Sequence, residues 1–221
     1  MKKTITSTLV ALLLSSQLAW AADGLTDHPA AGFKYKDKDP YTLVSDKNWF
    51  TTLPAFDKDG NVNVLITIPA GTSIIWELSP LTGNISRLVR EGKPQSVQYM
   101  GYPGNYGVIA RVLTENKEPL EALVLGDPMP RGTAVKAKII GALRLAGSPD
   151  GEVIRIIAVH ESSPLYSATS IADLISNYPG ATSILETWFV NRNGKEKSRS
   201  LGYLDVEKTQ EWLSQFSQAT K

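Results

Sequence analysis

Two neighbouring stretches decide the fold of this chain: Gly101-Tyr102-Pro103-Gly104-Asn105-Tyr106-Gly107 and, a few residues on, Asn116-Lys117-Glu118-Pro119-Leu120-Glu121. In the first, a proline and glycines bend the backbone around two tyrosines, and the apolar residues 108–113 follow as a strand. In the second, a proline separates two carboxylates, and an apolar run continues to residue 125. The pattern predicts a β-hairpin whose polar corner lies at the mouth of a barrel.

The carboxylates of Glu118 and Glu121 have two open interpretations at this point. A fixed proline beside two carboxylates is a cradle for a hard cation such as Mg²⁺, which prefers oxygen ligands. The same residues also fit an ordinary solvent-exposed turn, because acidic side chains are mostly exposed and need no ligand there.

The first 21 residues are predicted to be a secretory signal peptide. Lys2 and Lys3 form a positive start, Leu9 to Leu14 an apolar stretch, and Ala19-Trp20-Ala21 a small-residue cleavage site. The stretch is short for a membrane span, and no later stretch is apolar enough to cross a bilayer. We therefore expect an exported protein, periplasmic or secreted, without a membrane span in its mature chain.

Charge and cysteine content exclude several classes of function. After removal of the signal peptide the chain has 21 basic and 22 acidic residues. A nearly neutral chain offers no electrostatic case for nucleic-acid binding. The chain has no cysteines, so disulfides and thiolate metal sites are excluded, and the fold relies on its own core.

The body of the chain, residues 61–221, is predicted to be mainly β with C-terminal helices. Short runs rich in β-formers alternate with glycine, proline and aspartate turns, which is typical of a closed or nearly closed barrel. Helical spacing then appears, and Asp205 is a predicted helix cap. The expected strands are 62–68, 74–78, 85–88, 108–113, 120–125, 135–145 and 153–159, and the expected helices are 170–178, 181–191 and the segment after Asp205.

Residues 22–60 are predicted to be an N-terminal extension. Residues 23–39 are rich in lysine, glycine, proline and aspartate and are expected to form a mobile or surface-draped arm. Short strands are expected at 41–45 and 49–56. Asp57-Lys58-Asp59-Gly60-Asn61 resembles the start of a calcium loop, but Val62 and Ile68 occupy the glycine and final acid positions, so a hairpin turn is predicted instead.

Tyr102-Pro103-x-Asn105-Tyr106-Gly107 and the acid pair that follows resemble the core of the soluble family-I inorganic pyrophosphatases. The resemblance covers about residues 62–213. It is supported by Ile66-x-Ile68-Pro69, Trp76-Glu77, Gly83, Gly141-x-Leu143 and Arg155-Ile156-Ile157-Ala158-Val159. It implies an α+β fold with a closed OB-like β-barrel flanked by the C-terminal helices. Because bacterial members assemble as hexamers, it also implies a possible homo-oligomer.

The resemblance further implies hydrolysis of pyrophosphate, or of another phosphate compound, with Mg²⁺ and no organic cofactor. Such hydrolysis relies on metal ions and on side chains that neutralise phosphate oxygens. The implied catalytic residues are Glu77, Tyr106 and Arg155, the implied substrate-binding residues are Tyr102, Arg87 and Arg90, and the implied metal ligands are Glu118, Glu121 and Asp150.

Several positions depart from the family pattern. The family carries three aspartates where this chain has Asn116, Glu118 and Glu121, and a lysine at Arg155. Thr67, Ile75 and Val153 stand in place of a glutamate, a phosphate-binding lysine and an aspartate, and Trp188-Phe189 replace a tyrosine–lysine pair for the product phosphate. We therefore expect weakened or lost hydrolysis. The alternative is a non-catalytic binding or assembly module built on the same fold.

Overall fold

A computed structural model describes residues 29–148, 151–194 and 197–217 of the chain. The strands and helices are short and follow the turn residues of the sequence. The strands are β1 (Phe33–Lys36), β2 (Asp39–Ser45), β3 (Val62–Ile68), β4 (Trp76–Leu78), β5 (Ile85–Arg87), β6 (Val89–Arg90), β7 (Lys93–Pro94), β8 (Asn105–Leu113), β9 (Pro119–Leu125), β10 (Ala134–Ser148), β11 (Gly151–Val159) and β12 (Arg199–Leu204). The helices are α1 (Trp49–Thr52), α2 (Ile171–Asn177), α3 (Ala181–Asn191) and α4 (Val206–Ser217).

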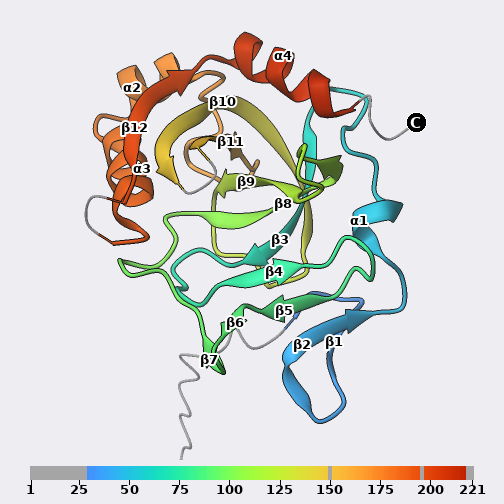
Figure 1. Cartoon of the computed structure of the whole chain (residues 1–221). Coiled ribbons are helices and arrows are strands. Elements are labelled where there is room, and N and C mark those ends of the chain that lie inside the picture. Colours follow the sequence, from blue (N-terminus) through green and yellow to red (C-terminus); the bar gives the residue numbers. More distant parts are fainter. Residues whose placement is uncertain (1–28, 149–150, 195–196, 218–221) are drawn as a thin grey trace, which may run out of the picture.

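Five strands form a closed circuit of pairings. β3 pairs with β8, β8 with β9, and β3 with β10, all antiparallel, while β9 pairs with β11 in parallel. β10 and β11 then pair with each other and complete the circuit. Figure 1 shows these strands curled around one another, with α4 lying across the long β10. The prediction of a mainly β fold with C-terminal helices is confirmed.

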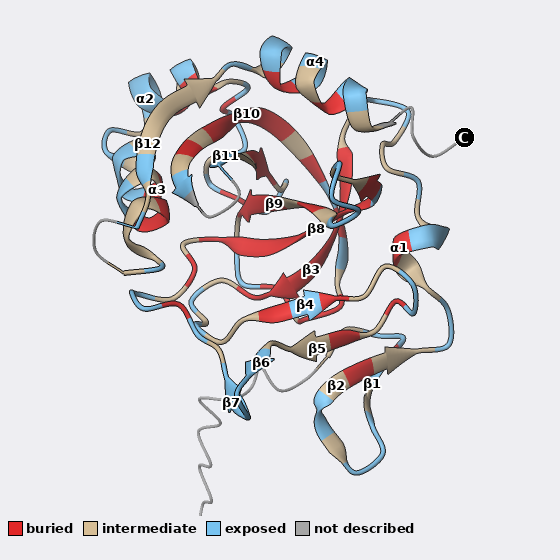
Figure 2. Ribbon diagram, in the orientation of Figure 1, coloured by how far each residue is buried: buried red, intermediate tan, exposed pale blue. Residues whose placement is uncertain are grey.

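Alternate residues of the circuit form two separate apolar clusters. One cluster takes side chains from all five strands, such as Val64, Ala122 and Ile156, together with Leu213 of α4, and so fills the barrel. The other lies on the opposite faces of the same strands, where Leu123 and its neighbours pack against α2, α3, β4 and β5. Figure 2 shows the resulting band of buried residues through β3, β8 and β9. The site described below lies on this second face.

The N-terminal segment is integrated into the fold. β1 and β2 form a hairpin that continues through β5 to β4 in one four-stranded sheet. Phe33 and Leu43 are buried in the same cluster that covers the outer face of the barrel. The expected loose arm at 23–39 is therefore wrong for residues 33–36, because Phe33 has apolar partners that the local sequence does not reveal.

Residues 49–52 form the helix α1, so the strand expected at 49–56 is wrong. The reason is local: the side chain of Asn48 accepts hydrogen bonds from the N–H groups of Phe50 and Thr51 and caps a helical turn. The turn at 57–61 is confirmed, since Asp57 Oδ1 accepts from the N–H groups of Asp59 and Asn61.

The three C-terminal helices match their predicted segments, and β12 was not predicted. β12 pairs with β10 and contains Gly202, which has a positive φ of 89° and lies at an irregular point of the register. In the part of the chain that the structure describes, no helix combines the length and apolar character needed to cross a membrane. The predicted signal peptide, residues 1–21, lies outside the described residues.

Candidate active site

Strand register brings Tyr106, Glu121 and Arg155 together. In the β8–β9 pair Tyr106 lies opposite Leu123, so Glu121, two residues earlier on β9, is on the same face. In the parallel β9–β11 pair Ile157 lies opposite Leu123, so Arg155 is level with Glu121. The two strands of one hairpin and a third strand from a later part of the sequence thus present one polar group each to one place on the outer face of the barrel.

A single carboxylate oxygen is the centre of this cluster. Glu121 Oε2 accepts a hydrogen bond from Tyr106 Oη at 2.8 Å and another from Arg155 Nη1 at 2.6 Å. The side chains of Arg155 and Glu121 are 18% and 35% exposed, so this ion pair is shielded on one side and open to solvent on the other. Charge-assisted contacts of this length fix both side chains in one geometry.

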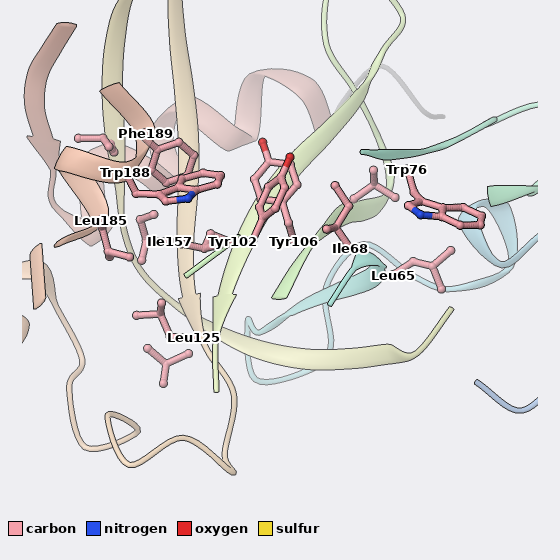
Figure 3. Packing of buried hydrophobic residues seen from close by; sticks show 14 of the residues in the cluster. Leu65, Ile68, Trp76, Tyr102, Tyr106, Leu125, Ile157, Leu185, Trp188 and Phe189 are labelled. Carbon is pink, nitrogen blue, oxygen red and sulfur yellow. The ribbon is translucent and has the colours of Figure 1, made fainter. Parts of the chain in front are cut away.

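An aromatic wall lies beside the ion pair. The ring centres of Tyr102 and Tyr106 are 5.1 Å apart, and those of Tyr102 and Trp188 are 4.6 Å apart. Figure 3 shows the two tyrosines side by side with their hydroxyl oxygens at the same end. Burial raises the pKa of Tyr106 to about 12 and also raises the pKa of Tyr102. Both hydroxyl groups are therefore protonated donors at neutral pH.

Glu77 and Glu118 surround this centre at longer range. Burial is the main cause that raises the pKa of Glu77, and the negative charges of Glu121 and Glu118 raise it further, against the opposing effect of Arg90. Glu77, on β4, therefore lies within electrostatic range of the ion pair. Glu118 is exposed just before β9, and its backbone N–H and carbonyl bond to Thr114 in the hairpin turn.

The two arginines expected to bind substrate lie in different places. Arg87 is in the N-terminal sheet, with its guanidinium 4.8 Å from the ring centre of Tyr41 and 5.3 Å from that of Trp76. Arg90 is exposed on β6, and its charge acts on Glu77. Arg90 thus belongs electrostatically to the cluster, whereas Arg87 is stacked between aromatic side chains.

The described residues do not fit a cage for several magnesium ions. The central carboxylate oxygen, Glu121 Oε2, already accepts hydrogen bonds from Arg155 and Tyr106. Glu152 forms a two-point ion pair with Arg144, at 2.6 and 3.1 Å. Among the described residues, no three acidic or histidine side chains are arranged to hold a metal ion. Asp150, the third expected ligand, lies outside the described residues.

Arg192 belongs to the cluster and was missed by the sequence analysis. It follows α3, and its guanidinium lies 5.9 Å from the ring centre of Tyr106 and 5.8 Å from that of Trp188. Burial lowers the pKa of Arg192, but the influence of Tyr106, Tyr102 and Glu121 outweighs it and the pKa is raised. The sequence did contain a signal for Arg192. It follows Trp188 by four residues and Phe189 by three, and residues at these separations share one side of a helix.

The barrel with its C-terminal helices has the fold class of solved inorganic pyrophosphatases. A family model described as inorganic pyrophosphatase matches residues 64–221, which is more than half of the chain. The chain therefore belongs to the inorganic pyrophosphatase family.

Individual relatives agree with this assignment. An inorganic pyrophosphatase of Sulfolobus acidocaldarius is 35% identical over 124 residues, which cover 55% of this chain and 66%, just under two thirds, of that protein. An inorganic pyrophosphatase of Synechocystis sp. is 33% identical over 158 residues, 70% of this chain and 89% of that protein.

Solved structures show the same fold. The inorganic pyrophosphatase from Thermus thermophilus has a TM-score of 0.66 at 24% identity, over 79% of this chain and 99% of that chain. The one from Schistosoma japonicum has a TM-score of 0.71 at 19% identity, over 80% of this chain and 74% of that chain.

Proposed function

We propose that this chain binds a phosphoric anhydride, inorganic pyrophosphate first, at the Tyr106–Glu121–Arg155 centre, and that it hydrolyses it weakly with Mg²⁺. The observation that carries the proposal is the convergence of Tyr106 and Arg155 on Glu121. It supports both parts of the proposal, because it assembles phosphate-binding groups and at the same time occupies the carboxylate that a metal ion would need.

The binding part rests on donors held in place before a ligand arrives. A guanidinium has five N–H groups in a fixed fork, and the ion pair of Arg155 uses one of its nitrogens. Glu121 orients that fork, and the protonated hydroxyl of Tyr102 lies beside it, while the single O–H of Tyr106 is donated to Glu121 and helps to fix the carboxylate. Preorganised donors stabilise a phosphate oxyanion without having to reorganise during binding.

The weakness of hydrolysis rests on the donor set. Magnesium requires near-ideal octahedral oxygen coordination, and in the family it supplies charge neutralisation and an activated water. Here Asn116 and Val153 offer no carboxylate where the resemblance implies one, and Arg155 competes for Glu121. Glu77, Glu118 and Glu121 lie within range of one another, so a divalent cation is attracted to the cluster but is held loosely.

Binding and turnover are tested separately on the purified chain from Ala22. Calorimetric titration with pyrophosphate in EDTA measures binding, and phosphate release with Mg²⁺, Mn²⁺, Co²⁺ or Zn²⁺ measures hydrolysis. We expect binding without metal and an affinity at least about tenfold weaker in Arg155→Met, the effect of losing one charged hydrogen bond. Arg144→Met, which removes an ion-paired arginine outside the cluster, is the matched control. Absence of any binding by the wild-type chain would refute the proposal.

A non-catalytic binding or assembly module is the second candidate. The specific observation in its favour is again the engaged Glu121 carboxylate, since a chain that has exchanged its metal ligand for an ion pair retains binding groups without the means of activating water. Pyrophosphate binding without phosphate release under any of the four metals would favour this candidate.

We also propose that the chain is exported and acts as a homo-oligomer outside the cytoplasm. The basis is the Lys2-Lys3 start, the leucine-rich stretch and Ala19-Trp20-Ala21 for export, and the family for assembly. N-terminal sequencing is expected to begin at Ala22, and retention of Met1 in a cytosolic fraction would contradict export. Light scattering of the mature chain measures its oligomeric state.

A further inference from the structure

Arg192 is held at the edge of the cluster by its own backbone. Its N–H donates to the carbonyl of Trp188 at 2.9 Å and closes the last turn of α3, and its carbonyl accepts from the N–H of Gln98 at 2.7 Å. Trp188 and Phe189, each 1% exposed, anchor the preceding turn in the core. The base of the Arg192 side chain therefore has little freedom to move away from the tyrosines.

The guanidinium of Arg192 has aromatic neighbours and no carboxylate partner. Besides the rings of Tyr106 and Trp188, the ring centre of Phe189 lies at 5.5 Å. Over the described ranges, each ion pair joins an acidic side chain to another cation, and none includes Arg192. Cation–π contacts offset only part of the cost of keeping a charge away from water. The residue is half-buried, so that cost is not negligible.

The charge at this end of the cluster is unbalanced. Glu121 is the acidic group whose charge acts on Arg192, and its Oε2 is already bonded to Arg155 and Tyr106. Arg155 and Arg192 thus share the nearby charge of Glu121 beside the pair of tyrosine hydroxyls, while Glu77 and Glu118 act on the cluster at longer range. An anionic ligand with several oxygens would neutralise the excess charge and accept from both forks.

The position of Arg192 at the end of α3 indicates the chemical class of this anion. Arg192 comes three residues after Phe189, on the same side of the helix. The resemblance places a phosphate-binding lysine at the position of Phe189, which here is a buried apolar residue. We propose that Arg192 binds the phosphoryl oxygens of the ligand in place of that lysine, and so makes binding of a phosphate group independent of metal ions. This inference rests on the proposed function, since it assigns a further residue to the same site.

The test is calorimetric titration of the mature chain in EDTA with pyrophosphate and, separately, with inorganic phosphate. Arg192→Met keeps the length of the side chain and removes its charge, and we expect the affinity to fall by at least about tenfold. Arg192→Lys keeps the charge but lacks the forked guanidinium, so its affinity is expected to fall by a smaller factor. Arg199→Met, which removes an exposed arginine of β12, is the matched control and is expected to bind as the wild type does.

The outcomes separate this inference from the proposed function. Loss of affinity for pyrophosphate alone assigns Arg192 to the intact anhydride, and loss for both ligands assigns it to a phosphoryl group that free phosphate also occupies. If the wild-type chain binds and Arg192→Met binds equally well, Arg192 is a structural cation and the inference is wrong, while the proposed function stands. If the wild-type chain binds neither ligand, both are wrong. If Arg192→Met fails to fold, Arg192→Lys decides the question. An affinity of Arg192→Lys equal to that of the wild type and of Arg199→Met would overturn the role of the guanidinium fork.

Discussion

At the scale of single residues, one carboxylate decides what the site can do. Glu121 is long enough to reach both Tyr106 on β8 and Arg155 on β11, and its Oε2 accepts from both. Partial shielding strengthens these contacts compared with a fully exposed pair. The same contacts order the donors that we propose bind phosphate and engage the oxygen that a metal would require.

The hydrogen bond from Tyr106 to Glu121 is expected to contribute to folding stability. Tyr106→Phe keeps the buried ring and removes only the hydroxyl, so we expect the free energy of unfolding to fall by about 1 kcal/mol. Tyr102→Phe is the matched control, because the Tyr102 hydroxyl forms no side-chain hydrogen bond within the described residues. Urea denaturation measures both variants, and equal losses in the two would contradict the assigned role of the Tyr106 hydroxyl.

The raised pKa of Glu77 predicts a pH dependence of stability. In the range just above the ordinary carboxyl pKa of about 4.3, the folded chain holds a proton on Glu77 that the unfolded chain has released. Stability therefore falls as pH rises through this range. Glu77→Gln removes that fall, so it is expected to match the wild type near pH 3.5 and to exceed it at pH 7. The gain is below about 1 kcal/mol, because this side chain is only partly shielded and solvent screens its charge.

Thermal unfolding across this pH range checks the effect. Glu207→Gln, a change of an exposed glutamate on α4, is the control and is expected to leave the curve parallel to that of the wild type. A Glu77→Gln curve that also runs parallel to the wild type from pH 3.5 to 7 would contradict the raised pKa of Glu77.

At the scale of elements, the β1–β2 hairpin completes the sheet that carries Glu77. β2 pairs with β5, and β5 pairs with β4, on which Glu77 lies. Leu43 of β2 is fully buried and joins the cluster on the outer face of the barrel. The hairpin therefore supports the position of a site residue although it contributes no polar group to the site.

Removal of this packing is expected to destabilise the whole fold. Leu43→Ala leaves a cavity under the N-terminal sheet and is expected to lower the free energy of unfolding by about 2–5 kcal/mol. Lys34→Ala on the neighbouring strand changes an exposed side chain and is the control, with an expected change below about 0.5 kcal/mol. Chemical denaturation followed by tryptophan fluorescence measures both. A Leu43→Ala variant as stable as Lys34→Ala would mean that the hairpin is a loosely attached arm.

At the scale of the whole molecule, the chain has the fold of the inorganic pyrophosphatase family, but its polar site groups differ from those that the resemblance implies. The fold is that of the family, and Tyr106, Glu121 and Arg155 meet on the outer face of the barrel, with Glu77 within electrostatic range. The metal-binding charge implied at Asn116 and Val153 is missing. Groups that act as one catalytic unit lose their effect together, so the weakened turnover that we propose requires only a small number of changes.

Restoring the acids is expected to recover part of the hydrolysis. The triple change Asn116→Asp, Glu118→Asp and Glu121→Asp recreates the aspartates that the resemblance implies and frees space between Arg155 and the carboxylate. We expect phosphate release to rise by about tenfold or more, with a steeper dependence on Mg²⁺, because each electrostatic contributor is worth about 10²–10³ in rate and only some are restored. The double change without Asn116→Asp is the control. Wild-type turnover already near 10² s⁻¹, an ordinary enzyme rate, would contradict the weakened site.

The sequence by itself determined the class of fold, and it singled out Tyr106, Glu121 and Arg155, which the structure brings into contact. Turn residues around Tyr102 and Tyr106, the apolar runs and the helical spacing after residue 170 each depend on local propensity, and local propensity is readable along the chain. The motif around Tyr106 was sufficient to indicate the family.

The tertiary structure alone decided which polar groups meet. Glu121 and Arg155 are 34 positions apart, and their contact depends on the register of two parallel strands, which no local pattern specifies. Arg192 joins them because the burial of Trp188 and Phe189 fixes the orientation of α3. For the same reason Phe33 became part of the core and β12 a strand: partners from distant segments, rather than the residues themselves, supply the free energy that orders them.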